Sequence, residues 1–496
     1  MTRRDQRHRQ PVRAAPVKGS PRPVHDPART VALEVLRGVH EHDAYANLLL
    51  NSVLAREELD ARDAAFATEL TAGTLRMRGL YDAVLATLVG RRLSDLDPAV
   101  LDVLRLGTHQ LLSMRVPSHA AVSTSVDLVR ASVGPRPAGL VNAVLRKVAG
   151  RDVDAWVVVV TPVDADRLDR LALRYSHPRW IVDELEHALD NAADEHALEG
   201  DVVAEAERAP TQPAGDGDGA ADDELARLLA ADNEVGAVTL VARPGLAEPE
   251  ELLVRGARRG TLSPWAVRLP GGNPAAVRAV REHRAGVQDE GSQLVAWLCA
   301  QASVTGRDVS WLDLCAGPGG KAAVLGAVAA QRGAHLVANE VQPHRAALVR
   351  QAVKGLSNVT VTMHDGRRPS WEPASFDRVL VDAPCTGIGA LRRRPEARWR
   401  RQPEDVAPLV RLQRELLVSA LDSVRPGGVV VYATCSPLLT ETHQVIDWAR
   451  SQRPARIQQL PSLPADARVA NDFLQLWPHR HDTDAMFAAV LERLPQ

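Results

Sequence analysis

Apolar residues recur at helical spacing through the first part of the chain. Asp26 and Pro27 form a favoured helix start, since Asp is a good N-cap and Pro is tolerated in the first turn. The apolar positions from Ala32 to Val39 then fall on one face of a helix. Similar patterning continues through residues 26–150 and predicts an all-helical domain that is long enough to bury its own core.

The last part of the chain, residues 287–496, alternates short apolar runs with helical segments. Near-continuous apolar strands separated by helices predict a doubly wound, Rossmann-like α/β domain with a mostly parallel sheet. The expected strands lie near residues 309–314, 335–340, 359–363, 377–382 and 429–433. Ligands of such sheets bind beyond the carboxyl ends of the strands, so the residues at those ends are the candidates for a functional site.

The residues between these two parts, 151–286, are interpreted as a linker followed by a small α/β module. Val157–Val160 is apolar and has the length of a strand. Residues 191–235 contain thirteen acidic and two basic residues, so we expect a surface insertion or flexible loop there, over about 191–225, and no core element. Two further short strands are expected at Val238–Val241 and Trp265–Leu269.

The length and charge of the chain limit the number of domains and the kind of partner to expect. A chain of 496 residues is too long for a single core and predicts two or three domains. The net charge of −2 gives no general reason to expect a polyanionic partner, but residues 1–25 alone carry a net charge of +6. This basic arm is expected to be disordered, and two roles stay open for it: contact with phosphates, or a solubilising tail.

The four cysteines are Cys299, Cys315, Cys385 and Cys435, and no two of them are closely spaced. This spacing argues against a disulfide framework or a zinc site, so we expect no metal and a reducing, cytoplasmic location. No run of residues has the length of a membrane span or resembles a signal peptide. Cys299 lies on an apolar helix and is expected to be a buried small hydrophobe.

Three short segments carry the candidate chemistry. LDLCAGPGGKAA at 312–323 is typical of a strand, a glycine turn and a helix start, which together let backbone N–H groups approach a ligand closely. VDAPCTG at 381–387 and YATCSP at 432–437 each place a cysteine just after a short apolar strand. The strand ends therefore hold Asp313, Glu340, Asp365, Asp382, Cys385 and Cys435.

The glycine turn by itself is shared by dinucleotide-binding folds and methyltransferases. Its AGPGG pattern departs from the GxGxxG pattern that a pyrophosphate requires, and this favours S-adenosylmethionine. Glu340 can accept hydrogen bonds from ribose hydroxyls, and Asp365 offers a polar contact for an adenosine edge. Turn or cap chemistry is the alternative for Asp313 and Asp365.

These segments resemble the RNA 5-methylcytosine methyltransferase family, and within it the group of small-subunit ribosomal RNA methyltransferases B. The matching segments are QDEGSQL at 288–294, LDLCAGPGGKA at 312–322, DGR at 365–367, DAPCTGIGALRRRPEARW at 382–399 and YATCSPLLTET at 432–442. The resemblance covers nearly the whole chain apart from the basic arm and the acidic insertion. One departure within the motifs is Gly317, where many relatives have Ala, and we expect that difference to be harmless.

The resemblance implies a fold, a substrate and a cofactor. Residues 26–150 would adopt the NusB RNA-binding fold, the small module would bind RNA, and residues 287–496 would form a catalytic domain on a seven-stranded, mostly parallel sheet. The expected partners are S-adenosylmethionine and small-subunit ribosomal RNA, with no membrane and no metal, and the protein is expected to be a monomer. Two alternatives stay open: methylation of a cytosine in tRNA, and a non-catalytic role in ribosome assembly.

The same resemblance assigns roles to the two cysteines. Cytosine C5 is a weak nucleophile, and addition of a thiolate at C6 converts the ring to an enamine that can accept a methyl group. Cys435 would attack C6, Cys385 would assist release of the product, and Asp382 would bind the N3/N4 edge of cytosine. The opposite assignment, with Cys385 as nucleophile, is the alternative.

Residues for cofactor and RNA also follow from the resemblance and the local composition. The cofactor-binding residues would be Asp313, Cys315, Ala316, Gly317, Pro318, Gly319, Gly320, Lys321, Glu340, Arg345, Asp365 and Asp382. Residues 391–401 hold six arginines and one tryptophan, a composition that favours RNA contact over a merely solvated face. The expected RNA-binding residues are Arg392, Arg393, Arg394, Arg398, Trp399 and Arg400.

Overall fold

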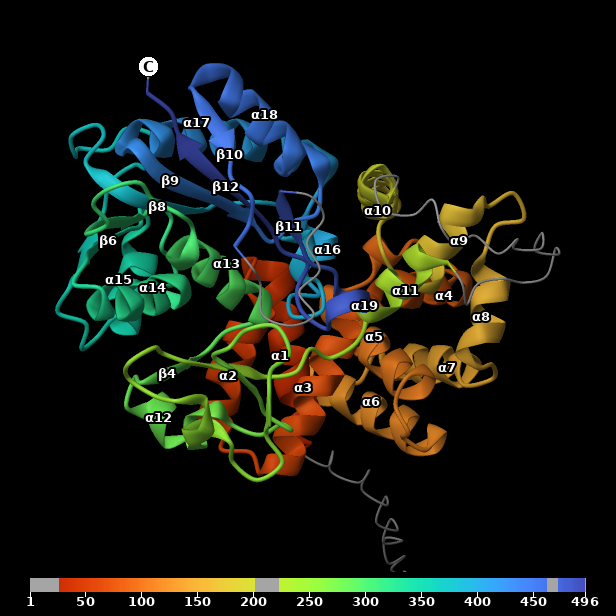
Figure 1. The fold of residues 1–496 in the computed structure, drawn as a ribbon. Coiled ribbons are helices and arrows are strands. Elements are labelled where there is room, and N and C mark those ends of the chain that lie inside the picture. Colours follow the sequence, from red (N-terminus) through yellow and green to blue (C-terminus); the bar gives the residue numbers. More distant parts are fainter. Residues whose placement is uncertain (1–25, 201–222, 462–471, 496) are drawn as a thin grey trace, which may run out of the picture.

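A helical bundle begins the protein, whose computed structural model describes residues 26–200, 223–461 and 472–495. The helices are α1 (Pro27–His42), α2 (Ala46–Glu57), α3 (Ala61–Arg76), α4 (Arg78–Val89), α5 (Pro98–Leu112), α6 (Ser118–Ser132) and α7 (Ala138–Val148) (Figure 1). The side chain of Asp26 caps α1 by accepting a hydrogen bond from the Arg29 N–H at 3.0 Å, as predicted. α5 is central, because every residue from Ala99 to Gln110 is buried. The predicted all-helical domain is confirmed.

Four helices follow this bundle: α8 (Val153–Val160), α9 (Arg167–Arg174), α10 (Arg179–Gly200) and α11 (Glu224–Ala231). The apolar run Val157–Val160, which has the length of a strand, forms the end of helix α8, because Asp152 caps that helix and Trp156 packs into the helical core. The prediction of no core element in the acidic stretch is wrong, since Leu225 and Leu229 of α11 are buried. Residues 1–25 and 201–222 lie outside the described residues.

A small antiparallel sheet comes next, with the strand order β2-β3-β1-β4. Its elements are β1 (Thr239–Ala242), β2 (Arg258–Arg259), β3 (Ala266–Arg268), the short α12 (Arg278–Arg281) and β4 (Ala285–Val287). Leu240, Leu252 and Val267 belong to a separate small core beneath this sheet. The two strands predicted in this region are confirmed.

The C-terminal domain is built on a larger sheet of order β10-β12-β9-β8-β5-β6-β7, with β11 paired to β12. The strands are β5 (Ser310–Asp313), β6 (His335–Asn339), β7 (Val359–Thr362), β8 (Phe376–Asp382), β9 (Val424–Thr434), β10 (Ala455–Ile457), β11 (Phe473–Gln475) and β12 (Phe487–Arg493). Strands β9, β8, β5, β6 and β7 are parallel, and β12 runs antiparallel to β9. All five predicted strands are confirmed.

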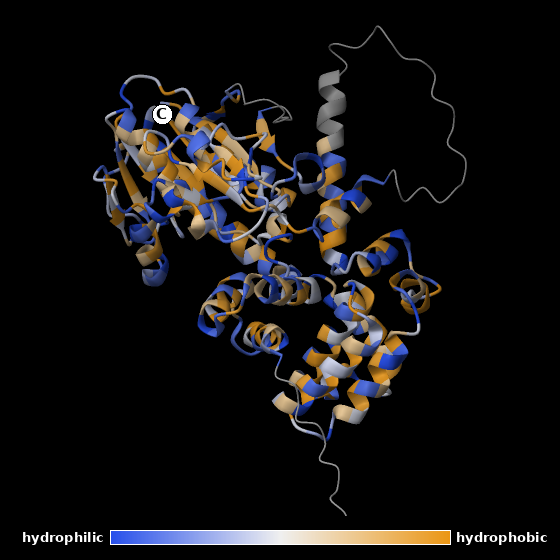
Figure 2. Cartoon of the chain, turned by 90° about the horizontal axis from the view of Figure 1, so that it is seen from below, coloured by the Kyte–Doolittle hydropathy of each residue, from blue (hydrophilic) through white to orange (hydrophobic). Residues whose placement is uncertain are grey.

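Helices cover both faces of this sheet, so its central strands are largely apolar (Figure 2). Alternate residues of β9 show the two faces: Val429 and Val431 belong to one core, and Val430 and Tyr432 to the other. The first core contains α13 (Glu290–Gln301), α14 (Gly320–Gln331) and α15 (Pro343–Ala352), and the second contains α17 (Val406–Ser423) and α18 (His443–Gln452). The doubly wound architecture is thereby confirmed.

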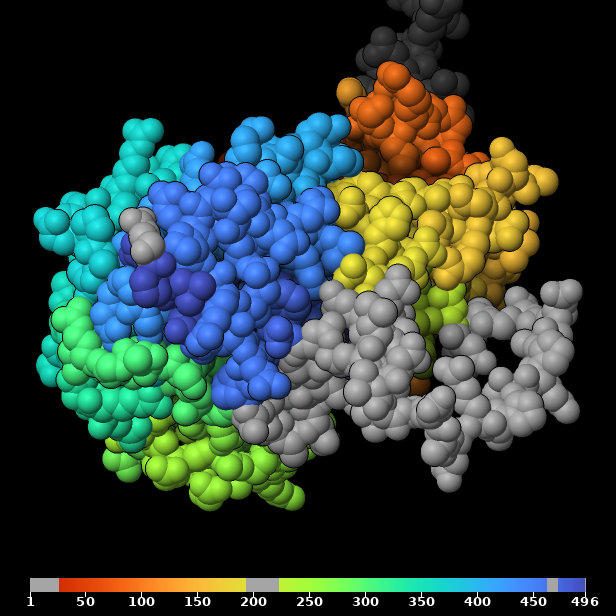
Figure 3. Space-filling view, turned by 45° about the horizontal axis from the view of Figure 1, so that its top comes forward, coloured from red at the N-terminus to blue at the C-terminus, as the bar shows by residue number. Residues whose placement is uncertain are grey.

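The helical parts pack directly on the C-terminal domain. Ile181 of α10 and Leu229 of α11 share a core with Ile388, Leu391 and Trp477. In Figure 3 the yellow surface of α9 and α10 meets the blue surface of the C-terminal segments. The short helices α16 (Ala397–Arg400) and α19 (Pro478–His481) lie at this junction. Among the described helices, none is long and apolar enough to cross a membrane.

Candidate active site

Parallel pairing brings the loops that follow β5, β8 and β9 to one edge of the sheet. Asp313 pairs with Leu380 of β8, and Asp382 pairs with Ala433 of β9. The two cysteines that follow β8 and β9 therefore meet: the Sγ atoms of Cys385 and Cys435 lie 3.4 Å apart. Fifty positions separate these residues in the chain, so the sheet and not the local sequence creates the pair.

The two thiols are not equivalent. The pKa of Cys435 is lowered, mainly because the Cys385 thiol donates a hydrogen bond to it. The positive charges of Arg394 and Lys321 also lower this pKa, whereas burial and the negative charge of Asp382 raise it. The pKa of Cys385 is raised by its hydrogen bond with Cys435 and by burial. Cys435 is therefore the thiol that ionises first and the better nucleophile of the two.

A buried carboxylate, Glu441, holds the two cysteine loops together. Its Oε1 accepts a hydrogen bond from the Thr386 N–H at 2.9 Å, and its Oε2 accepts one from Thr386 Oγ1 at 2.5 Å. The Gln413 amide donates to Glu441 Oε1 and to the Pro384 carbonyl, both at 2.9 Å. The backbone carbonyl of Glu441 accepts a hydrogen bond from the Tyr432 hydroxyl at 2.7 Å.

Sequence reasoning missed Glu441 and Thr386, although both lie in segments that carry the family resemblance. The local signal was weak, because a single Glu in a short turn after a cysteine loop is indistinguishable from a solvated surface residue. Burial decides its role, and Glu441 is fully buried.

Beside the thiols lies a group of charged residues at the ends of β5 and β8. Lys321 Nζ is 2.9 Å from Asp382 Oδ2. Asp313 is fully buried, and its carboxylate oxygens make no well-aligned hydrogen bond with any described residue. Burial and then the charge of Asp382 raise the pKa of Asp313 to about 8. A buried carboxylate without a partner is costly, so this position suits a ligand that brings a hydrogen-bond donor or a positive charge.

The glycine loop after β5 has two positions where a side chain would not fit. A Cβ on Gly317 would lie 2.1 Å from Glu340 Oε2, and one on Gly319 would lie 2.5 Å from the Cβ of Ala352. Gly319 also has a φ of +110°, which side-chain-bearing residues rarely adopt. The atoms that crowd Gly317 are the ends of the Glu340 and Arg345 side chains, so Ala at this position would require these side chains to move. The expectation that Ala is tolerated here stays a prediction.

The other residues expected to bind a cofactor lie on the same sheet edge. Arg345 Nη2 donates to the Gly317 carbonyl at 2.6 Å, and its Nε lies 3.5 Å from Glu340. Glu340 accepts a hydrogen bond from the Gln342 N–H at 2.9 Å and is nearly fully buried. Asp365 is half-buried and pairs with Arg367, which lowers the pKa of Asp365. Cys315, Ala316, Pro318 and Gly320 complete the loop between β5 and α14.

Most side chains of the arginine segment 391–401 bind protein groups and do not form the RNA-facing surface that the sequence predicted. Arg398 is fully buried, and its guanidinium donates to the carbonyls of Arg76, Ser176 and Asp232 and to Asn233 Oδ1. Burial lowers its pKa to about 10. Arg392 is also buried, and its Nη2 lies 2.7 Å from Asp482 Oδ1. The prediction that Arg392 and Arg398 contact RNA is therefore corrected, because protein groups surround both side chains.

The neighbouring side chains of this segment also bind protein groups. Trp399 Nε1 donates to the Leu75 carbonyl at 2.7 Å, and Arg393 forms ion pairs with Asp289 and Asp484. Arg400 Nε lies 2.6 Å from Asp43. The segment thus joins the N-terminal helices to the catalytic domain. Arg394 differs from the rest, because it is exposed.

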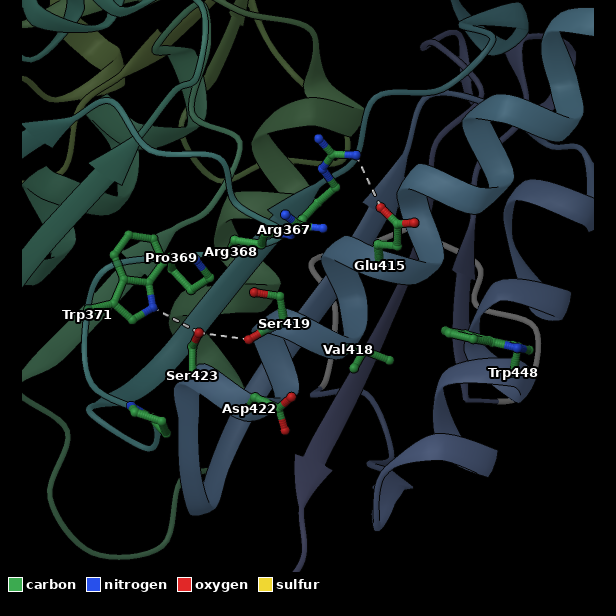
Figure 4. Close-up of a pocket in the computed structure, with 11 residues that line it drawn as sticks. Arg367, Arg368, Pro369, Trp371, Glu415, Val418, Ser419, Asp422, Ser423 and Trp448 are labelled. Atoms are coloured by element: carbon green, nitrogen blue, oxygen red, sulfur yellow. Dashed lines mark hydrogen bonds and ion pairs between the residues drawn. The ribbon is translucent and has the colours of Figure 1, made fainter.

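A separate cavity of about 640 Å³ lies on the α17 side of the sheet (Figure 4). Trp371 donates to Ser423 Oγ at 2.9 Å on one side of it, and Arg367 Nη1 lies 3.3 Å from Glu415 on another. Its lining contains none of the predicted site residues. Among the described residues, no group of three or more His, Cys, Asp and Glu side chains is placed to hold a metal ion.

Comparison with known proteins shows the family to which this chain belongs. The family model described as 16S rRNA methyltransferase RsmB/F matches residues 303–492, and the NusB family model matches residues 26–150. The ribosomal RNA small subunit methyltransferase B of Klebsiella pneumoniae strain 342 is 30% identical, with 93% of this chain and 97% of that protein covered. The chain belongs to the RsmB/F family of 16S rRNA methyltransferases.

Two further proteins are similar to this chain over nearly its whole length. A Mycobacterium tuberculosis H37Rv protein, named for an expected methyltransferase activity, is 49% identical, with 95% of this chain and 97% of that protein covered. The crystal structure of PH0851 superimposes with a TM-score of 0.74 at 22% identity and covers 95% of this chain and 99% of that chain. This last likeness shows a shared fold. The resemblance to an RNA methyltransferase with a NusB-like domain is confirmed.

Proposed function

We propose that this protein transfers a methyl group from S-adenosylmethionine to C5 of a cytosine in small-subunit ribosomal RNA through a covalent adduct with Cys435. The observation that carries the proposal is the 3.4 Å approach of the Cys385 and Cys435 sulfurs at the sheet edge. The methyltransferase names of the relatives support the reaction class, and the name of the Klebsiella pneumoniae relative supports the ribosomal substrate.

The residues at the sheet edge fit the cofactor that this reaction needs. S-adenosylmethionine supplies an electrophilic methyl group when it is bound. The buried Asp313 carboxyl group, which has no side-chain hydrogen-bond partner among the described residues, and the Asp382 carboxylate suit the positively charged end of such a ligand. Gly317 and Gly319 let the backbone approach it closely, and Glu340 is placed to accept hydrogen bonds from ribose hydroxyls.

The two thiols have different roles toward the target base. The Cys435 thiolate forms an Sγ–C6 bond, which moves the electrons of the ring double bond toward C5, and C5 accepts the methyl group. A base removes the C5 proton, the double bond re-forms and the Sγ–C6 bond breaks. Cys385 assists this release from 3.4 Å away, and Asp382 hydrogen-bonds the N3/N4 edge of the cytosine. The target base must be unstacked to reach the thiol.

The cysteine variants test the proposal. With small-subunit RNA and labelled cofactor, Cys435→Ala should lose methylation and adduct formation while keeping cofactor affinity. Cys385→Ala should accumulate a covalent protein–RNA adduct, visible on a denaturing gel. Adduct lost in Cys385→Ala and kept in Cys435→Ala would reverse the two roles.

Bisulfite mapping of the RNA from strains with and without the protein identifies the substrate. A protein-dependent 5-methylcytosine in small-subunit ribosomal RNA supports the proposal. Such a mark in tRNA alone would favour the tRNA alternative. No mark in either RNA would favour a non-catalytic assembly factor.

A further inference from the structure

We propose that Tyr45, on the N-terminal helical domain, is a stacking site for an unpaired nucleotide next to the target base. The inference deepens the proposed function and rests on it, because it names where the RNA leaves the catalytic site. Tyr45 is an aromatic residue with 49% of its surface exposed, and it sits at the start of α2. Exposed aromatic rings of this kind are the usual platforms on which single-stranded bases stack.

The ring of Tyr45 lies beside the segment that leaves the Cys385 loop. The guanidinium carbon of Arg400 is 5.1 Å from its centroid, and that of Arg394 is 5.8 Å away. Both distances are within the range of cation–π contacts. Both guanidinium groups lie over the ring, so a base would stack on the part of the Tyr45 ring that they leave exposed. Arg400 is paired with Asp43, and the exposed Arg394 provides the positive charge for a neighbouring phosphate.

This arrangement is held rigidly, although Tyr45 and the arginines belong to different domains. Arg400 Nε lies 2.6 Å from Asp43 Oδ1, and its Nη2 donates to the Ala44 carbonyl at 2.8 Å. The Ala46 N–H donates to Glu396 Oε1 at 3.3 Å. These bonds fix the chain on both sides of Tyr45, so the ring has a defined position relative to the catalytic loop.

Arg394 connects this platform to the reacting thiol. It is exposed, unlike Arg392 and Arg398 in the same segment. The Gly389 N–H donates to the Cys435 carbonyl at 2.9 Å, and the Arg394 N–H donates to the Ala390 carbonyl at 2.9 Å, so Arg394 lies one turn beyond the residues that contact the Cys435 loop. Its charge also helps to lower the pKa of Cys435. The platform therefore borders the catalytic loop, where a nucleotide that flanks the target cytosine would lie.

The chemistry of the patch favours RNA over a protein partner. A protein partner would be expected to cover a larger apolar area, whereas here guanidinium groups border a single exposed ring. Leu48, in the first turn of α2, is also exposed and extends the apolar surface by one residue. A base with its phosphates matches this combination of one flat apolar face and adjacent positive charge.

Binding of a short fluorescein-labelled oligocytidylate to the full chain tests the proposal. Tyr45→Ala should weaken binding by roughly 5- to 150-fold, the range measured for removal of one base–aromatic stack. Tyr45→Phe and Tyr45→Trp should retain wild-type affinity, because they keep the stacking face. With ribosomal RNA as substrate, Tyr45→Ala should raise KM and leave kcat and cofactor affinity unchanged.

Trp448→Ala is the matched control. Trp448 also lies under an arginine, with the Arg414 guanidinium 5.5 Å from its ring, but it is on α18 and away from the Tyr45 platform. Its removal should leave RNA affinity unchanged. Wild-type affinity in Tyr45→Ala, or an equal loss in Trp448→Ala, would overturn the proposal. Thermal unfolding of each variant identifies any that has lost its fold. If Tyr45→Ala is one of them, Tyr45→Leu carries the comparison, because it fills space at the site without an aromatic face and should also weaken binding.

The binding assay also separates this inference from the proposed function. If the wild-type protein binds the oligonucleotide but methylates no cytosine, the proposed function fails and the Tyr45 result still stands. If Tyr45→Ala methylates with an unchanged KM, the platform is refuted and the proposed function stands. If the wild-type chain binds no single-stranded RNA, the platform is refuted, and the labelled-cofactor assay with small-subunit RNA decides the proposed function.

Discussion

The sulfur of Cys385 lies 3.4 Å from the sulfur of Cys435, close to the contact distance of two sulfur atoms. A disulfide needs about 2.05 Å, so a small movement of either loop would allow the bond to form. Diamide should therefore take two electrons and two protons from this pair, link the residues and abolish methyl transfer. Dithiothreitol should restore the activity.

Peptide mapping by mass spectrometry measures the bond directly. A Cys299→Ser protein serves as the control, because Cys299 is buried on α13 and should take no part. Diamide inactivation without a peptide that links residues 385 and 435 would show that the loops do not meet in solution.

Alkylation should reveal the order in which the thiols ionise. The hydrogen bond from Cys385 lowers the pKa of Cys435, so iodoacetamide should modify Cys435 at a lower pH than an ordinary cysteine. Cys385→Ala removes that donor and should shift the rate profile of Cys435 to higher pH. Quantitative mass spectrometry of the peptide containing Cys435 gives the profile. An unchanged profile in the variant would mean that Cys385 does not stabilise the thiolate.

Asp313 should make the free protein less stable as pH rises. Its pKa is about 8 in the folded protein and about 4 in an unfolded chain, so the folded state binds more protons between these values. The contribution of Asp313 to stability is therefore greatest below about pH 4 and decreases as pH rises toward about 8. Asp313→Asn should unfold with a weaker pH dependence over this window and should bind S-adenosylmethionine poorly.

Calorimetry of the wild type and of Asp313→Asn at several pH values gives the stability of each protein as a function of pH. The difference between the two slopes reports on Asp313, because the other titrating groups contribute equally to both. Parallel curves for Asp313→Asn and the wild type would contradict the assignment. Added S-adenosylmethionine should reduce the pH dependence of the wild type, because it supplies the partner that the carboxylate lacks.

Glu441→Ala should affect the position of the two cysteine loops without affecting binding of the cofactor. The change leaves the Thr386 N–H without its acceptor and leaves the Thr386 hydroxyl with only Ser436 Oγ at 3.2 Å, at a cost of about 1–3 kcal/mol for a buried polar group. We expect kcat to fall, diamide linkage of the two cysteines to slow, and cofactor affinity to stay at the wild-type value. Thr386→Val removes one of these hydrogen bonds and should show a smaller effect in the same direction. Wild-type kcat and linkage rates in Glu441→Ala would exclude a positioning role.

Arg398 should contribute to stability and not to RNA affinity. Arg398→Ala deprives buried carbonyls of Arg76, Ser176 and Asp232 of their donor and should destabilise the protein by roughly 1–3 kcal/mol or more. Arg398→Lys should rescue little, because an ammonium cannot reproduce the planar fork. Thermal unfolding and RNA binding, measured on the same samples, separate the two effects. If Arg398→Ala lost RNA affinity while its stability stayed unchanged, Arg398 would be an RNA-binding residue after all.

The errors made from sequence all concern burial. Arg392, Arg394 and Arg398 have the same charge in the same run, yet two are buried at a domain junction and one is exposed beside the thiols. Val157–Val160 is as apolar as a strand, and it forms a helix because Asp152 caps it and Trp156 anchors it. For the arginines, contacts with residues distant in the chain decide which side chains are buried, and the local composition does not show these contacts. For residues 157–160 the helix cap at Asp152 is local, and the packing of Trp156 into the helical core is tertiary.

The sequence by itself determined the periodic elements, the glycine loop and the three strand ends at which the chemistry lies, because hydrophobic period and turn residues act over a few positions. Tertiary structure alone decided that Cys385 and Cys435 touch, that Glu441 holds their loops, and that Arg398 joins domains. Parallel strand pairing and domain packing create these contacts. The free energy of these contacts depends on the whole folded chain, so no short segment of the sequence predicts them.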